Sequence, residues 1–177
     1  YALYADMSHR AMSLMRDMAD GQEIYSIDEC FLDLTGIPND LVAHAQQMRR
    51  RIKQYLGLPT CVGIGHSKTL AKLANHIAKK RLHYQGVFSW SHCNRLEADA
   101  LMADIDIGEV WGVGRRLKIQ LEQFGMRSVC DLKYAQTSLI RKRFGVVLER
   151  TVHELNGVSC LTLEDTEEHQ AVRKHQI

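Results

Sequence analysis

Two adjacent acids, Asp28 and Glu29, interrupt a pair of short apolar runs and constrain this chain more than any other feature. Residues 24–27 and 30–34 on either side are rich in β-branched and aromatic side chains, which predicts a strand on each side. Successive strand side chains point to opposite faces, so neighbouring carboxylates converge on one point only where a strand bends or ends. Two acids at such a break can hold a divalent cation, and hard oxygen ligands favour magnesium.

A solvated hairpin turn is the simpler interpretation of the same pair, because Asp is common in turns. For an isolated Asp-Glu pair, the turn would be the better interpretation. The motifs in the rest of the chain reverse this preference and favour a metal site.

The composition is that of an ordinary folded chain with one domain or two small ones. Its 177 residues carry a formal net charge of only +2, which by itself does not indicate a nucleic-acid partner. The five cysteines are an odd, dispersed set without a C-x-x-C pair, which argues against a disulfide framework and against a zinc site. No apolar run approaches the length of a membrane span. We therefore expect reduced thiols and a cytoplasmic protein.

The apolar periodicity of the first 90 residues predicts an α+β arrangement. Gly21 and Gly57 are expected to end the first two helices, and Ser67 to cap the third. This order of elements is typical of a small mixed or antiparallel sheet covered by helices. The helices are expected at residues 1–20, 38–56 and 68–80, and the strands at 24–27, 30–34, 59–65 and 87–90.

The third of these helices is strongly basic. Residues 68–81 contain five Lys or Arg and no acid, and a strand that ends in Gly65 precedes the Ser67 cap. Helix N-termini offer free N–H donors, so this arrangement resembles an anion site, although the P-loop pattern is absent. The alternative is an ordinary soluble amphipathic helix, but the lack of a balancing acid favours an anionic partner.

The composition changes near residue 91, and the chain becomes helical. Residues 107–116 predict a short helix, a Gly-Val-Gly turn and a second helix, which together make a helix–hairpin–helix. The glycines let the backbone approach a phosphate, and the amides of the second helix face it. Glycine turns also join helices for packing alone. Residues 110–150, however, hold nine Lys or Arg against three acids, a charge distribution typical of proteins that bind the DNA backbone.

Two further helices are expected after the hairpin, capped by Ser128 and Thr137. The second is predicted to run unbroken through Leu155 to a stop at Gly157. Residues 158–177 have few large apolar groups, and we interpret them as an extended linker.

Three motifs in this order resemble those of the Y-family, or lesion-bypass, DNA polymerases. Residues 25–36, Tyr-Ser-Ile-Asp-Glu-Cys-Phe-Leu-Asp-Leu-Thr-Gly, look like the family's S-I-D-E motif. Residues 62–75 resemble the next palm motif, and residues 110–116 resemble the thumb hairpin. Residues 1–7 and 140–155 are most similar to the UmuC type, the catalytic subunit of bacterial DNA polymerase V. The resemblance covers essentially the whole chain.

The resemblance implies a palm at residues 1–90, a helix–hairpin–helix thumb at 91–160 and a linker at 161–177 that leads to a little finger. It implies that the carboxylates of Asp28 and Glu29 are catalytic and hold two magnesium ions. Lys79 matches the family lysine that reaches the incoming triphosphate, although Lys80 stands where a proline often follows. The residues that the resemblance places on DNA are Lys72, Gly112, Val113, Gly114, Arg115 and Arg116.

The activity implied by the resemblance is error-prone translesion DNA synthesis in SOS-type DNA repair, by two-metal phosphoryl transfer. The implied partners are primer–template DNA, a deoxynucleoside triphosphate, accessory protein subunits, a recombinase filament and a sliding clamp, without a membrane. The family's first palm strand, with its own catalytic aspartate, and the fingers are expected before Tyr1, and the little finger after Ile177. We therefore expect this stretch alone to bind magnesium weakly or not at all, and to lack polymerase activity.

Two other functions fit part of the sequence. A non-enzymatic helix–hairpin–helix module of a repair protein would bind DNA, but it leaves the acid pair and the basic helix at 68–80 unexplained. A nucleotidyl cyclase shares the palm architecture, but it predicts no DNA-binding thumb. Metal binding that requires nucleotide, together with DNA binding by residues 110–150, would separate the three functions.

Overall fold

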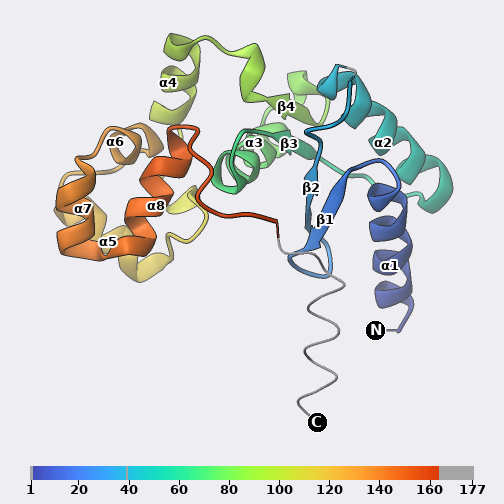
Figure 1. The fold of residues 1–177 in the computed structure, drawn as a ribbon, viewed down its shortest axis with the longest axis horizontal. Coiled ribbons are helices and arrows are strands. Elements are labelled where there is room, and N and C mark those ends of the chain that lie inside the picture. The colour runs from blue at the N-terminus through green and yellow to red at the C-terminus, as the bar shows by residue number, and fades with distance from the viewer. Residues whose placement is uncertain (1, 39, 164–177) are drawn as a thin grey trace. The chain divides into compact units, whose positions relative to one another are not determined.

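The computed structural model describes residues 2–38 and 40–163. They form two compact units. Figure 1 shows the fold, coloured along the chain from blue at the N-terminus to red toward the C-terminus. The first contains the described residues up to Thr60 together with Thr162 and Leu163, and the second is Cys61–Leu161. Most of the predicted linker at 161–177 lies outside the described residues.

The first unit packs two helices against an antiparallel hairpin (Figure 1). Its small core is centred on Met18, Met48 and Ile52. Gly57 ends the second helix in a left-handed conformation, as predicted. The elements are α1 Ala2–Arg16, β1 Gly21–Ile24, β2 Cys30–Asp33 and α2 Leu41–Leu56.

The predicted end of the first helix is wrong. α1 stops at Arg16 rather than next to Gly21. The N–H of Asp20 donates to the carbonyl of Asp33 on β2 at 2.8 Å, so the chain has already joined the hairpin before Gly21. The competing strand pairing therefore shortens the helix.

The strand predicted at residues 24–27 is also displaced. β1 instead covers Gly21–Ile24, and its last residue pairs with Cys30. The N–H groups of Tyr25 and Ser26 both donate to the carbonyl of Glu29, at 3.1 and 3.0 Å, which turns the chain directly after β1. The apolar run at 24–27 therefore lies mostly in the connection between the strands.

The second unit combines one strand pair with a series of helices (Figure 1). β3 and β4 pair in parallel, with α3 as the crossover between them. The chain is therefore α+β, but its strands form one antiparallel and one parallel pair rather than the single sheet predicted. The elements are β3 Val62–Ile64, α3 Lys68–Lys80, β4 Val87–Ser89, α4 Arg95–Ala103, α5 Arg115–Gln123, α6 Val129–Lys133, α7 Thr137–Phe144 and α8 Val146–Leu155, with 3₁₀ turns η1 Leu82–Tyr84, η2 Trp90–His92 and η3 Ile107–Glu109.

The bounds and the Ser67 cap of α3 are as predicted, whereas the helix predicted from Thr137 to Leu155 is two helices. The break is at Gly145, whose φ of +98° is incompatible with a continuous helix. Thr137 is the first helical residue of α7 and not its cap, because Gln136 occupies the cap position.

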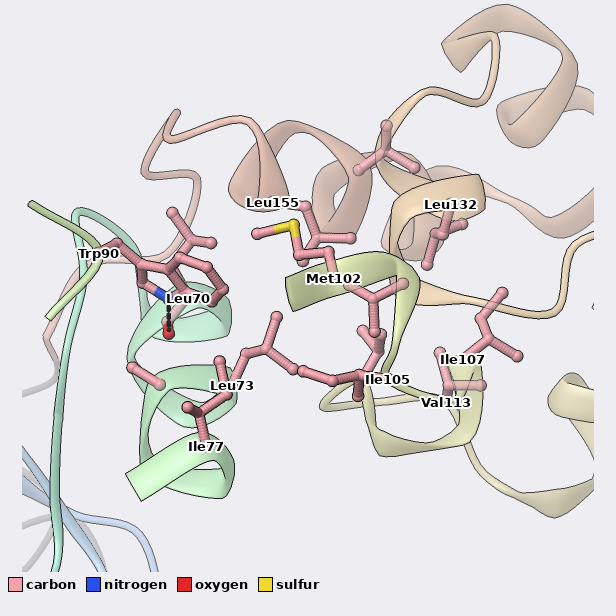
Figure 2. Close-up of a cluster of buried hydrophobic side chains, with 14 of the residues drawn as sticks. Leu70, Leu73, Ile77, Trp90, Met102, Ile105, Ile107, Val113, Leu132 and Leu155 are labelled. Atoms are coloured by element: carbon pink, nitrogen blue, oxygen red, sulfur yellow. Dashed lines mark hydrogen bonds between the residues drawn. The ribbon is translucent and has the colours of Figure 1, made fainter. Parts of the chain in front are cut away.

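One hydrophobic core joins residues 61–90 to the helices that follow. Leu73 and Ile77 of α3 face Met102 of α4 and Ile105, as Figure 2 shows. The indole N–H of Trp90 donates to the carbonyl of Leu70 at 2.9 Å within the same core (Figure 2). The core thus crosses residue 90. A shared core does not fix a functional boundary, so the palm at 1–90 and the thumb at 91–160 stay predictions.

None of the described helices is long and apolar enough to cross a membrane.

Gly63→Ala is expected to lower the free energy of unfolding by about 3 kcal/mol, the upper end of the usual penalty for an overpacked core. A Cβ at Gly63 would lie 2.1 Å from the backbone nitrogen of Asn75 and 2.4 Å from the carbonyl oxygen of Ala71, so β3 or α3 must move. Urea denaturation followed by circular dichroism measures the loss.

Gly114→Ala is the matched control for this change. Gly114 has a φ of −78°, and a Cβ added to it would meet no other group within 4 Å. An equal loss of stability in both variants would show that the close contact between β3 and α3 is not the cause.

Candidate functional site

The connection between β1 and β2 brings Asp28 and Glu29 together in one tight turn. The hydroxyl of Ser26 donates to Oδ1 of Asp28 at 2.6 Å, which orients this carboxylate. The carbonyl of Glu29 accepts two backbone N–H groups from the start of the turn. Asp28 is exposed and Glu29 half-buried. Local turn chemistry therefore places two consecutive acidic residues in the connection at the end of a hairpin.

The turn is anchored on two sides within the first unit. The hydroxyl of Ser8 on α1 donates to the carbonyl of Ile27, the residue before Asp28. The ring of Tyr25 packs edge-on against Phe31 of β2, with ring centroids 6.1 Å apart. These contacts hold the backbone of the turn on both its helix side and its strand side.

The donor chemistry of this turn fits magnesium. Adjacent carboxylates are hard oxygen ligands, and magnesium commonly takes one or two protein carboxylates and completes its shell with water and substrate phosphates. Within residues 2–38 and 40–163, no group of three His, Cys, Asp or Glu side chains gathers into a fuller metal site.

Lys72 and Lys79 lie on one face of α3 in the second unit. They are seven residues apart, so they are two turns, or about 10 Å, apart along the axis. Lys79 is exposed and Lys72 half-buried. His76, between them on the same face, pairs through Nδ1 with Oε2 of Glu109 at 3.3 Å. This face of α3 therefore carries two lysines, and His76 between them contacts Glu109 of η3.

The anion site predicted at the N-terminus of α3 is wrong, because the protein itself fills it. The carboxylate of Glu154 from α8 accepts hydrogen bonds from both the N–H and the hydroxyl of Thr69, each at 3.0 Å. The N–H of Leu70 donates to the Ser67 hydroxyl at 3.2 Å. These donors are already in use, so the basic residues of α3 must act along its side or at its other end.

At the predicted hairpin, the first helix is only a single 3₁₀ turn, η3, which a glycine turn and α5 follow. Gly112 has a φ of +91°, which an L side chain rarely adopts. The N–H of Val113 donates to the carbonyl of Val110 at 2.9 Å, and both side chains are buried. The two valines thus anchor the turn in the hydrophobic core of the second unit.

The outer side of this turn is open and positively charged. Side chains added at Gly112 and Gly114 would meet nothing within 4 Å. Gly114 is the N-cap of α5 and offers no side-chain cap, and Arg115 and Arg116 follow it in exposed positions. An anion can therefore approach the backbone amides and two guanidinium groups together.

Asp106 braces the hairpin through two contacts that sequence reasoning missed. Its Oδ1 accepts the N–H of Gly108 at 2.7 Å, and its Oδ2 accepts the Lys118 ammonium at 2.9 Å. The hydrogen bond from Lys118, followed by that from the Gly108 N–H, holds the pKa of the Asp106 carboxyl below its usual range. Because Asp106 pairs with Lys118, the arginines rather than this lysine provide the outward charge at the turn.

A second basic group lies at the end of α7. Arg141 pairs with Glu149 of α8 at 3.3 Å, and the Arg143 guanidinium lies over the ring of Phe124, 4.9 Å from its centroid. Lys142 between them is exposed. These contacts fix part of the charge that the sequence placed within residues 110–150.

Comparison with known proteins gives consistent results. The model of the impB/mucB/samB family matches residues 1–76. UmuC of Salmonella typhimurium strain LT2 is 47% identical over 168 residues, which is 93% of this chain and 39% of that protein. DNA polymerase IV of Moorella thermoacetica is 30% identical over 155 residues, which is 86% of this chain and 37% of that protein.

A solved structure matches over a similar span. The Y-family DNA polymerase chimera Dbh-Dpo4(243-245)-Dbh has a TM-score of 0.72 and 26% identity, and the match covers 93% of this chain and 47% of that one. The chain thus spans about two fifths of the length of the curated relatives that it matches.

Proposed function

The chain belongs to the UmuC/ImpB/MucB branch of the Y family of DNA polymerases, and we propose that it is the palm and thumb part of an error-prone polymerase that copies damaged DNA. The observation that carries the proposal is the exposed acid turn at Asp28 and Glu29, in a chain that is similar to UmuC over 93% of its length. A simple DNA-binding module has no use for that turn.

Asp28 and Glu29 are the proposed magnesium ligands. Bound magnesium would lower the pKa of a primer 3′-hydroxyl and neutralise charge on the phosphate under attack. The two carboxylates supply oxygen ligands, and the hydroxyl of Ser26 fixes the orientation of Asp28. The anchored turn keeps both acids in one place, so few conformations need to be frozen when a cation binds.

Lys79 and Lys72 of α3 are the proposed contacts to the substrates. Lys79 is exposed at the C-terminal end of the helix and would bind the incoming triphosphate as a point charge. Lys72, two turns earlier on the same face, would lie against the primer–template. Both roles need anionic ligands, which fits the absence of acids from residues 68–81.

The hairpin turn is the proposed grip on duplex DNA. Backbone amides at Gly112, Val113 and Gly114, together with Arg115 and Arg116, would contact phosphates and no base edges, so binding would be independent of sequence. The proposed partners are primer–template DNA and a deoxynucleoside triphosphate, and by family resemblance accessory subunits, a recombinase filament and a sliding clamp. The proposed domains are the palm at 1–90, the thumb at 91–160 and the linker at 161–177.

Asp28→Ala or Glu29→Ala in the full-length protein is expected to abolish nucleotide addition and leave DNA affinity nearly unchanged. Each change removes a metal ligand in the first unit and leaves the hairpin of the second unit intact. Primer extension and fluorescence anisotropy on the same preparations measure the two effects. Near-normal extension by Asp28→Ala, or a parallel loss of extension and DNA binding, would show that this turn is not the metal-binding centre.

Arg115→Ala and Arg116→Ala are each expected to weaken binding to all duplex sequences alike. Each removes one phosphate contact, so the slope of log affinity against log salt should flatten by about one unit. Anisotropy titrations over a series of salt concentrations, with two unrelated duplexes, measure this. Arg10→Ala is the matched control, because it removes an arginine of α1 that lies outside the hairpin and pairs with Asp6. A sequence-selective loss would indicate base readout and argue against a polymerase thumb.

A further inference from the structure

Glu154 is a fully buried carboxylate at the end of α8 that no metal-binding or DNA-binding role accounts for. Its exposed fraction is 0%. Oε1 accepts the N–H and the hydroxyl of Thr69 at the start of α3, and Oε2 accepts the N–H groups of Cys160 and Leu161, at 2.7 and 3.3 Å. Its backbone carbonyl accepts the Ser67 hydroxyl at 2.8 Å. One residue therefore joins α3, α8 and the segment after α8.

A contact of this kind requires accurate geometry. A buried carboxylate is tolerated only when hydrogen bonds replace its lost hydration, and here both oxygens are satisfied. The N-terminus of α3 adds the positive end of a helix dipole. Loss of Oε1 would leave the two buried donors of Thr69 without an acceptor. Leaving a buried donor unpaired costs more free energy than its hydrogen bond contributes. The pairing therefore fixes the first turn of α3 against α8.

Two further side-chain contacts also hold the far part of α3. Arg81, which follows the helix, pairs with Asp104 at 3.2 Å, and His76 pairs with Glu109 at 3.3 Å. These pairs are partly exposed and weaker than a buried one. The contact with Glu154 is thus the buried attachment of the first turn of a helix that carries Lys72 and Lys79 farther along its length.

We propose that Glu154 is a positioning residue for nucleotide binding, which acts by fixing α3, and with it Lys79, relative to the DNA-binding hairpin of the same unit. This inference rests on the proposed function of Lys79. An α-helix is stiff over its length, so a change at its first turn displaces side chains at its last. Glu154 touches neither DNA nor nucleotide and acts only through α3.

The test is Glu154→Gln in the full-length protein. The amide of Gln would face either the N–H groups of Cys160 and Leu161 or the donors of Thr69, so one pair loses its acceptor. We expect the KM for nucleotide to rise about fivefold or more, the low end of coupling between linked sites. The Kd for primer–template is expected to change less than the KM, because the hairpin contacts are unaltered and Lys72 is only one of the proposed DNA contacts. Steady-state primer extension and anisotropy measure the two constants.

Three further variants separate positioning from a general loss of structure. Thr69→Val removes one donor to Oε1 and should raise the KM less, whereas Thr69→Ser keeps the hydroxyl and should restore it. Glu149→Gln removes a carboxylate of α8 that pairs with Arg141, and it should leave the KM unchanged. A fall in thermal stability in Glu154→Gln and Thr69→Val without a change in KM would overturn the proposal.

The combination Glu154→Gln with Lys79→Ala decides whether the effect runs through this lysine. If it does, Glu154→Gln adds little to the KM of Lys79→Ala, whereas independent effects would multiply and contradict the proposal. The proposed function fails separately, if Lys79→Ala itself leaves the KM unchanged or Asp28→Ala still extends primers. If Lys79→Ala raises the KM and Asp28→Ala loses extension as expected, an unaffected Glu154→Gln would overturn only the positioning role.

Discussion

The buried carboxylate of Glu154 holds together the parts of the second unit that lie farthest apart in sequence. It accepts hydrogen bonds from Thr69 on one side and from Cys160 and Leu161 on the other. Around it, the apolar face of α3 packs into the same core as α4, α6 and α8. The consequence is that the basic helix and the glycine hairpin belong to one folded body. If they bind nucleotide and DNA as proposed, those two ligands contact the same compact unit.

The acid turn follows a different physical logic, because local hydrogen bonds and not a core position it. Two N–H groups close the turn on the carbonyl of Glu29, and the Ser26 hydroxyl orients Asp28. The carboxylates remain accessible to water and to a cation, which a buried pair would not. A metal centre needs both properties, a fixed backbone and oxygen ligands that solvent and a cation can reach.

Much of this arrangement follows from local sequence signals. The Ser67 cap and the apolar spacing give the correct bounds of α3, and the glycines at 112 and 114 locate the hairpin. The errors have non-local causes. Pairing of Asp20 with Asp33 shortens α1 and shifts β1, and a positive φ at Gly145 breaks a helix that periodicity alone extends. Glu154 gave no signal, because a single acid beside an apolar stripe is ordinarily solvated, and only its partner 85 residues away makes it structural.

Manganese binding tests most directly whether Asp28 and Glu29 form a catalytic metal centre. The full-length protein would be mixed with a chain-terminated primer–template and the matching nucleotide, and bound manganese counted by electron paramagnetic resonance. We predict about two ions per complex in the wild type, as in two-metal phosphoryl transfer, and fewer in Asp28→Asn with unchanged DNA affinity. Equal manganese stoichiometry in the two proteins would contradict the assignment of this turn as the metal-binding centre.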